Sequence, residues 1–500
     1  MLAQPTTTEP VNSRRGLGGF VDKITVLHGA VRELWLVFGA KLLAYFAYTV
    51  MNQTLALWLS SDLGYNDVDA GYIVMGWSAA MTLVTVLVGS LTDAIGLRRT
   101  FLLGVTVCLF SRIVMTSSVS AVPTLVLGLL PLAVGEALMG PVMVAGVQRY
   151  TTTAQRSISF SIFYMVMNVG ILLGNVVFDF ERHHLGEQGQ FTVPLLGAHL
   201  STYRTLFLTS AFLTVPNLFL LGLFLRHGVE VTDQGVKITP LPARKPQQSF
   251  INALISSVRE AGQRSVRIFT GLWHQTGFYK FLGFLGLAAL LRMVVMHMYY
   301  TYPKFGIRVL GAGAPVGQMW ALNQVTVILL VPLVGALSQK ISAYRMVVWG
   351  GFIAASSVFL MALPPAWFQP LADGWLGNLI AHRWLGVHGD VNPYYVMIVL
   401  FVLWWSIGEA VYSPRLYEYA AAIAPKGQEA SYMALSYLPF FLAKVLVGMF
   451  SGRLLDRYCP PAGARHPQTL WLIIALSAIV APVGLVALRR HIRAHEAGRE

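Results

Sequence analysis

Charged residues are scarce in this sequence. They make up 12% of its 500 residues, whereas a soluble globular domain carries about 25%. Hydrophobic residues make up 55%, and the mean hydropathy is +0.61. A chain of this composition has too few polar side chains to cover a water-exposed surface, which excludes an ordinary soluble protein.

Several chemical signatures are also missing. The only two cysteines, Cys108 and Cys459, exclude a disulfide framework and a cysteine-based metal site. The sequence contains neither the G-x-x-x-x-G-K-[ST] loop of ATP-driven pumps nor the H-E-x-x-H motif of zinc proteases. It also lacks the G-x-S-x-G motif of serine hydrolases. We therefore expect neither an enzyme nor a bound metal or other cofactor.

What the sequence does contain is apolar runs of membrane-spanning length, which recur from end to end. A spanning helix needs about 20 mostly apolar residues. Within lipid, such runs satisfy their backbone hydrogen bonds as helices, so we predict an all-α integral membrane protein. No cleavable signal peptide is visible, because the first 32 residues are polar and basic. The twelve predicted spans are 33–59, 71–91, 100–118, 123–147, 157–179, 203–225, 279–302, 315–338, 346–363, 393–414, 430–452 and 468–489.

The net charge of +14 comes from 36 Lys and Arg against 22 Asp and Glu. In a soluble protein this excess would suggest nucleic acid, which is not an expected partner here. Instead, Lys and Arg concentrate in the connections on one side of the predicted spans, as the positive-inside rule describes. We therefore expect a multi-pass protein of the cell (inner) membrane, with both termini cytoplasmic and its basic residues near anionic lipid headgroups.

The longest connection, residues 226–278, divides the spans six and six. It is either a solvated basic linker or a segment with an amphipathic helix on the inner leaflet, since Phe250, Leu254 and Val258 recur on one face. The predicted domains are an N-terminal tail at 1–32, a six-helix bundle at 33–225, the linker at 226–278, a second six-helix bundle at 279–489 and a tail at 490–500.

An internal repeat relates the two halves. The tripeptide Gly-Glu-Ala at residues 135–137, followed by Pro141, recurs at residues 408–410, followed by Pro414. The second set of six spans therefore resembles a parallel copy of the first. In transporters built from such repeats, the solute site lies between the halves near the middle of the bilayer.

The loop between the second and third predicted spans carries a longer motif. It matches the signature G-x-L-x-D-x-x-G-x-R-R at every constrained position, and in this respect the chain resembles the major facilitator superfamily. The resemblance implies two pseudo-symmetric six-helix bundles that move a solute by alternating access. It also implies that this loop has a gating role, carried by Gly89, Asp93, Gly96, Arg98 and Arg99.

A narrower resemblance points to one branch of that superfamily. Phe163-Tyr164 with Asn168 and Gly170 is similar to the F-Y-x-x-x-N-x-G signature of the proton-dependent oligopeptide transporters, or peptide transporters. This resemblance implies a proton-coupled symporter of peptide-like or amino-acid-like solutes. In the branch, the first helix carries E-x-x-E-R-F-x-Y, but here the stretch that begins at Lys41 has lost both acids and the Arg. Any proton coupling must then use other groups.

Ionisable side chains inside the spans are the strongest functional signal, because each costs about 2.5–3.5 kcal/mol at a helix centre. The cations outnumber the acids, and an anionic or carboxylate-bearing solute would offset the excess. Arg112 could pair with Glu136, Arg292 could bind the solute or pair with Glu409, and Lys41 could bind solute or reach the inner headgroups. The side chains at depth are Lys41, Arg112, Arg292 and Lys444 against Glu136 and Glu409.

Polar and aromatic side chains recur at helical spacing beside several of these charges. A charge is costly in lipid, so we assign the stripes that include one to the solute site. A buried carboxylate or imidazole can exchange a proton near neutral pH, so Glu409, then Glu136 and His297, are the predicted proton carriers. The predicted solute contacts are Lys41, Tyr45, Tyr48, Asn52, Tyr164, Asn168, Arg292, Tyr299, Trp405, Glu409 and Lys444.

The sequence thus predicts a secondary transporter that moves a small organic solute with protons and functions as a monomer. Two alternatives remain open. One is a facilitative uniporter of the same fold, because the first-helix acids are missing. The other is a membrane sensor or assembly subunit that transports nothing, which a loss of solute flux with retained binding would reveal.

Overall fold

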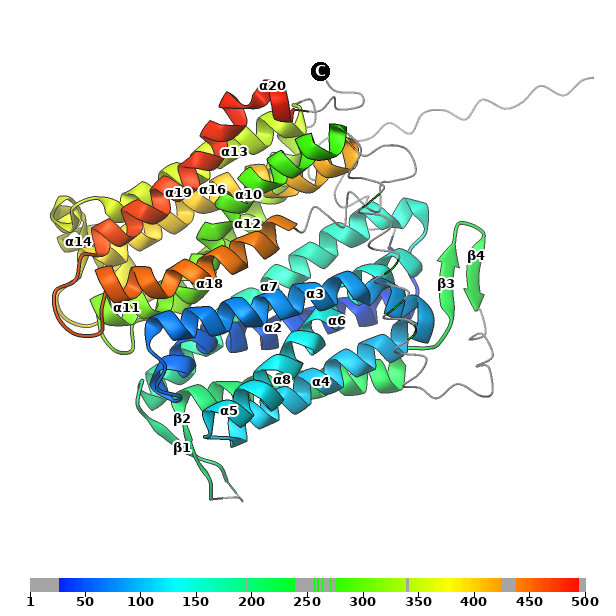
Figure 1. Ribbon diagram of the computed structural model, residues 1–500, viewed down its shortest axis with the longest axis horizontal. Helices are drawn as coiled ribbons and strands as arrows, with labels where there is room; N and C mark the ends of the chain where they lie inside the picture. Colours follow the sequence, from blue (N-terminus) through cyan, green and yellow to red (C-terminus); the bar gives the residue numbers. More distant parts are fainter. Residues whose placement is uncertain are drawn as a thin grey trace, which may run out of the picture.

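Long helices arranged side by side make up nearly all of the structure (Figure 1). The predicted amphipathic pattern around Phe250 and Leu254 lies outside the described residues. The computed structural model describes residues 27–194, 197–238, 276–338, 341–423 and 438–493, together with the single residues 256, 259, 263 and 270.

The N-terminal half contains six long helical passages, two of which include a π-helical turn. Its third and fourth passages are joined at Ser118–Ser120, and its fifth is the longest helix of the half. The elements are α2 (Arg32–Ser61), α3 (Asp67–Ile95), α4 (Leu97–Ser117), α5 (Ala121–Pro123) with η1 (Thr124–Leu129) and α6 (Leu130–Arg149), α7 (Thr153–Leu185), and α8 (Thr202–Phe219) with η2 (Leu220–Phe224).

The C-terminal half repeats this pattern and adds a series of short helical turns before α16. The elements are α10 (Thr276–Tyr300), α11 (Tyr302–Leu310), α12 (Val316–Leu337), α13 (Ala343–Val358) with η3 (Phe359–Ala362), η4 (Pro365–Phe368), α14 (Gln369–Asp373), α15 (Trp375–Gly377), η5 (Asn378–Trp384), α16 (Pro393–Ala422), α18 (Leu438–Tyr458), α19 (Pro467–Ala487) and α20 (Arg489–Ile492).

Two small antiparallel hairpins were not predicted. Strands β1 (Gln190–Thr192) and β2 (His199–Ser201) join α7 to α8, while β3 (Val229–Thr232) and β4 (Gly235–Ile238) follow η2. Strands of three or four residues are too short to show a clear alternating pattern in sequence. We call the end of the bundles that carries β1 and β2 the outer end, following the orientation expected from the Lys and Arg distribution.

The predicted spans correspond to the helices. Among the described residues, eleven helices are long and apolar enough to cross a membrane. We count α3 as the twelfth, because its 29 residues extend about 43 Å beside α2 (Figure 1). The largest differences are extensions: α7 runs over Thr153–Leu185 rather than 157–179, starting at a capping box formed by Thr152 and Gln155.

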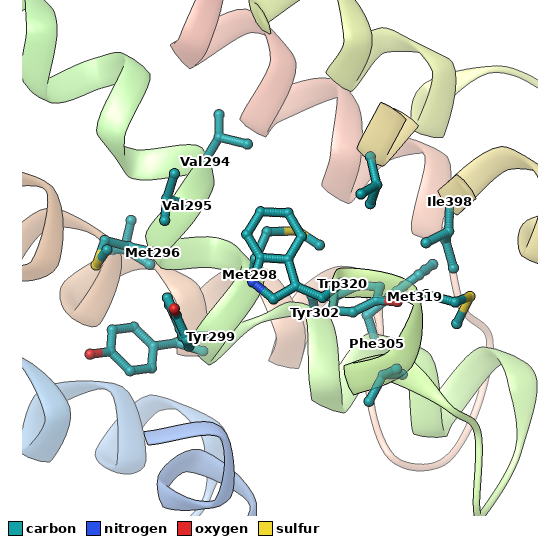
Figure 2. Close-up of a cluster of buried hydrophobic side chains, with 14 of the residues drawn as sticks. Val294, Val295, Met296, Met298, Tyr299, Tyr302, Phe305, Met319, Trp320 and Ile398 are labelled. Carbon is teal, nitrogen blue, oxygen red and sulfur yellow. The ribbon is translucent and has the colours of Figure 1, made fainter. Parts of the chain in front are cut away.

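A large apolar core fills the outer part of the C-terminal half. Figure 2 shows side chains from four helices in this one buried cluster: Met298 of α10, Phe305 of α11, Trp320 of α12 and Ile398 of α16. Each is at most 1% exposed. Close packing of this kind excludes water, so polar groups beside it interact in a medium of low dielectric constant.

The internal repeat has a structural counterpart at two glycine contacts. In the N-terminal half a Cβ added at Gly104 would lie 3.3 Å from the carbonyl oxygen of Gly135, so α4 and α6 approach closely. In the C-terminal half the same relation joins α13 and α16, where a Cβ at Gly350 would lie 2.9 Å from the carbonyl oxygen of Gly408. The Gly-Glu-Ala repeat therefore brings the same helix pair together in each half.

The close contact at Gly408 makes a strong stability prediction. In a Gly408→Ala variant the new methyl carbon would lie 2.7 Å from the Cα of Ala354, so α13 and α16 must separate. Overpacking of this kind costs about 1–3 kcal/mol. We expect a lower apparent melting temperature in detergent. Gly140→Ala is the matched control, because its Cβ would meet nothing within 4 Å; an equal loss in both variants would contradict the packing argument.

Candidate functional site

Glu409 of α16 is the centre of a polar cluster within the C-terminal half. Its Oε2 accepts hydrogen bonds from Trp405 Nε1 at 3.2 Å and from Asn323 Nδ2 at 3.0 Å. Trp405 lies one turn before Glu409 on the same helix face, as the sequence spacing predicted. The carboxylate is 11% exposed, so it is nearly enclosed while remaining open on one side.

Arg292 of α10 completes this cluster. Its Nη1 lies 3.6 Å from Glu409 Oε1, and its Nη2 donates to Ser413 Oγ at 2.7 Å. The guanidinium also lies over the rings of Tyr412 and Phe440, 5.4 and 4.9 Å from their centroids. In this conformation Arg292 is therefore paired with Glu409, which is the second of the two roles that the sequence left open.

A second ion pair lies inside the N-terminal half. Arg112 Nη2 of α4 donates to Glu136 Oε1 of α6 at 2.5 Å, and Arg112 Nη1 donates to Thr214 Oγ1 of α8. The two charged side chains are 3% and 10% exposed. The predicted pairing of Arg112 with Glu136 is thus present, and it resembles the Arg292–Glu409 pair of the other half.

Lys41 of α2 is held by aromatic rings. Its Nζ lies 4.0 Å from the ring centroid of Tyr45 and 4.1 Å from that of Phe163 on α7. The residue is 4% exposed, so it does not extend to the inner headgroups in this conformation. Within the described part of the chain no ion pair includes Lys41, and the two rings stabilise the ammonium by cation–π interaction.

Lys444 of α18 connects the two halves. Its Nζ donates to the hydroxyl of Tyr48 on α2 at 3.2 Å and lies 5.6 Å from the ring centroid of Trp77 on α3. One turn further along α2, Asn52 accepts a 3.4 Å hydrogen bond from Tyr300 of α10. Tyr48 and Asn52 of α2 therefore face the other half, whereas Lys41 contacts Phe163 of its own half.

A chain of buried amides also crosses between the halves. Gln53 donates to Asn175 at 2.8 Å, and Asn175 donates to Gln324 of α12 at 3.3 Å. Gln324 then donates to Asn323 at 2.9 Å, and Asn323 donates to Glu409. Through these four amides, the environment of Glu409 depends on how α7 of the first half lies against α12 of the second.

Two predicted site residues, Asn168 and His297, form hydrogen bonds within their own helices. Asn168 donates to the backbone oxygen of Tyr164 one turn earlier at 2.9 Å. His297 shares a 2.7 Å hydrogen bond with Thr301 on its own helix and is 1% exposed. Tyr299 is buried in the apolar core of Figure 2. The structure therefore does not bring Asn168 or His297 into direct contact with Glu409 or Glu136.

The predicted gating loop is described only in part. Gly96 ends α3 and begins α4 with a φ of +85°, as expected for a tight turn. Arg98 donates to the backbone oxygens of Leu221 and Gly222 at the end of the same half, and Arg99 is exposed. Gly89 and the side chain of Asp93 lie outside what the structure describes.

At the outer end, a buried carboxylate joins the two halves. Asp67 at the start of α3 forms ion pairs with Lys304 and Arg308 of α11, each at 2.7 Å. Asp67 and Lys304 have side chains that are 5% and 4% exposed. We call these three residues the outer latch.

A second outer contact lies at the end of α7. Arg182 pairs with Asp179 at 3.1 Å and with Glu187, and Arg182 donates to the backbone oxygen of Ala314 in the other half at 3.3 Å. Burial would raise the pKa of Glu187, but the Arg182 charge and hydrogen bonds from Arg182, Tyr203 and the backbone of Gly313 lower it overall. The lowered pKa favours the charged form of Glu187, which accepts a hydrogen bond from the backbone of Gly313 in the other half at 3.2 Å.

The sequence reasoning missed the outer latch and the amides. Lys304 and Arg308 are one turn apart in a segment on the predicted outer side, where the positive-inside rule favours few cations. Two cations on the side where few are expected were therefore a signal in the sequence that could have indicated an ion pair here. Asn323 and Gln324 are uncharged and carry no such signal.

The comparisons with known proteins agree with this architecture. Residues 37–438 match the family model of the Major Facilitator Superfamily. No curated protein matches the chain at a significant level. The similar solved structures include three whose sequences are 13–16% identical to this chain.

The first of these is a POT family transporter in complex with 5-aminolevulinic acid (TM-score 0.66, 16% identity, 93% of this chain and 97% of that one). The second is the peptide transporter POT in complex with sulfate (TM-score 0.64, 16%, 92% and 95%). The third is the nucleoside transporter NupG (TM-score 0.62, 13%, 91% and 100%). At these identities the likeness shows a shared fold and not a shared solute. Because the family model covers most of its length, this chain belongs to the Major Facilitator Superfamily.

Proposed function

We propose that this superfamily member is a secondary active transporter that moves a small, carboxylate-bearing organic solute together with protons by alternating access. The proposal places the solute between the halves, near Tyr48 and Lys444 on one side and Glu409 with Arg292 on the other. Peptide-like and amino-acid-like solutes fit this chemistry, in keeping with the branch resemblance at Phe163 and Tyr164.

The observation that carries the proposal is the distribution of buried charge. Arg112 is neutralised by Glu136, and Arg292 is neutralised by Glu409. Lys41 and Lys444 remain, and within the described residues neither forms an ion pair, although Lys444 is also attracted by Glu136 from a longer distance. A buried cation without an acid is costly, and a solute carboxylate between the halves would offset that cost.

Two of the similar structures support an anionic ligand. One POT family transporter holds 5-aminolevulinic acid and another holds sulfate. Both ligands carry an anionic group that an ammonium can bind. In this chain the two lysines flank the paired rings of Tyr45 and Tyr48, whose centroids are 6.1 Å apart.

Glu409 is our proposed proton carrier. When Glu409 accepts a proton, its attraction to Arg292 weakens, which leaves the guanidinium available to a solute carboxylate with bidentate geometry. Proton uptake and solute binding are then linked through one side-chain pair. Glu136 is the second candidate, because Arg112 already holds it.

The solute charge is tested by removing the lysines. We expect Lys444→Met and Lys41→Met to weaken binding of a carboxylate solute, found by a thermal-shift screen, by about 10- to 100-fold, or about 1.4–2.7 kcal/mol. Binding of its neutral amide analogue should change little. Lys280→Met is the control, because Lys280 lies at the inner end of α10 outside the proposed site. Equal affinity of the unaltered protein for the charged and neutral analogues would contradict the proposal.

A uniporter is the second candidate, and Lys41 favours it, because this position carries an acid in the proton-coupled branch. The two are separated by measuring solute uptake into liposomes with and without an imposed proton gradient. We further propose that the protein functions as a monomer in the cell membrane with both termini cytoplasmic.

A further inference from the structure

The segment between η3 and α16 covers the outer turns of α16. Its short helices η4, α14, α15 and η5 all contact that helix, and Figure 1 shows α14 at the outer end of the C-terminal half. From this segment Phe368, Ala372 and Ile380 are at most 8% exposed, and they belong to the same apolar core as α16.

The burial of α16 changes along its length. Residues 394–399 are all buried, although they make up more than a full turn. Deeper in the helix, Trp404 is 52% and Ile407 is 45% exposed. A helix at the edge of a bundle faces lipid on one side, so α16 meets lipid from Trp404 inward, and the covering segment takes the place of lipid nearer the outer end.

The covering segment presents a second apolar row outward. Trp367, Leu371, Trp375 and Leu379 follow one another at a spacing of four residues and are 68%, 42%, 75% and 45% exposed. We call this row the outer stripe. Gln369 and Asp373 lie on a different face, are exposed, and share a 2.8 Å hydrogen bond. The segment is therefore amphipathic on its outward side.

The depth of the outer stripe can be bounded. Trp404 lies eleven residues after Pro393, where α16 begins, which corresponds to about 16 Å along the helix axis. The covering segment packs against the part of α16 between Pro393 and Trp404 that is nearer the outer end. The hydrocarbon core is about 30 Å thick and the headgroup layers add about 5–8 Å on each side. The stripe therefore falls at the boundary between hydrocarbon and headgroups.

We propose that the outer stripe is a membrane-binding surface that inserts into the interfacial region of the outer leaflet. Tryptophan is enriched at this depth, because its ring is apolar and its N–H can reach water or lipid carbonyls. Arg383, which is exposed at the end of the segment, supplies a positive charge for lipid phosphates. This surface is separate from the solute site and is independent of the transport chemistry.

The proposal is tested with a fluorophore attached to single cysteines in the full-length protein, whose natural Cys108 and Cys459 are both buried. We compare Trp375→Cys on the outer stripe with Asp373→Cys on the polar face, each in phosphatidylcholine nanodiscs that hold one copy. The label at 375 should be quenched several-fold more by spin-labelled lipid than by aqueous iodide, with a blue-shifted emission. The label at 373 should show the reverse.

Two results would overturn the inference. If iodide quenches the label at 375 as strongly as the label at 373, the stripe faces water. If the label at 375 is shielded from iodide only when nanodiscs hold several copies, a second copy covers the stripe rather than lipid. Unchanged melting temperatures in both variants confirm that the fold is intact in either case.

Discussion

Replacing Asp67 by Asn should open the outer end of the protein. The substitution leaves the two cations of the outer latch buried without their shared acid, and breaking a buried ion pair from one side costs about 3–5 kcal/mol. Separation of the halves exposes Lys304 and Arg308 to water and relieves that cost. At 1.4 kcal/mol for each factor of ten, the ratio of outer-closed to outer-open protein should fall about a hundredfold or more.

Distances between spin labels measure this shift. Ser120→Cys and Ala462→Cys place labels at exposed outer positions in different halves, and Asp67→Asn should add a population of longer distances. Asp69→Asn is the matched control, because Asp69 is exposed and its hydrogen bonds within the described residues are with the neighbouring Asn66. An unchanged distance distribution in Asp67→Asn would show that the outer latch does not hold the halves together.

Replacing Glu409 by Gln should abolish uphill accumulation of the solute. The amide oxygen of Gln can still accept from Trp405 and Asn323, so the local structure should be retained, but no proton can be carried. Counterflow exchange, which needs no net proton movement, should survive. Both are measured in proteoliposomes with labelled solute. Accumulation that persists in Glu409→Gln, in Glu136→Gln and in the double variant would eliminate a carboxylate carrier.

The role of Arg292 is separated from that of Glu409 by a double variant. If Arg292 binds solute, Arg292→Ala should weaken binding of an anionic solute by about 2–5 kcal/mol, and Arg292→Lys by less, because Lys keeps the charge but loses the planar fork. If Arg292 only neutralises Glu409, the variant with both residues replaced by Ala should recover binding that either single variant loses. The 3.6 Å separation makes this cycle necessary, because the effects of substitutions at two residues in contact do not add.

The helices were predictable because hydrophobicity in a membrane protein is a local property of the sequence. Each predicted span has a matching helix, since twenty apolar residues in lipid have little alternative to a helix. The ends were harder to place: α7 continues to Leu185, and Arg182 in its last turns forms ion pairs with Asp179 and Glu187. The hydropathy of the sequence does not indicate which polar contacts extend a helix beyond its apolar residues.

The sequence predicted the candidate site mainly through its charged residues. Glu409, Arg292, Arg112 and Glu136 stood out because an ionisable group at depth needs a partner, and the structure pairs all four. The amides of Asn323 and Gln324 were not found, because their importance comes from a contact between helices that are distant in sequence. Asp67 was missed because it lies at a helix start, where an acid is ordinary.

The contact between α3 and α18 has a consequence for how this protein changes shape. A Cβ on Gly71 would lie 2.5 Å from the carbonyl oxygen of Gly448, and one on Gly448 would lie 2.8 Å from Met75 Cα, so these helices meet backbone to backbone. Dispersion attraction weakens steeply, and a gap of about 0.5–1 Å already loses a quarter to a half of it. The side-chain contacts across these helices, such as the hydrogen bond from Arg453 to the Tyr72 hydroxyl, also depend on this close approach. The outer interface should therefore be bistable, either fully closed or fully released, with few molecules at intermediate openings.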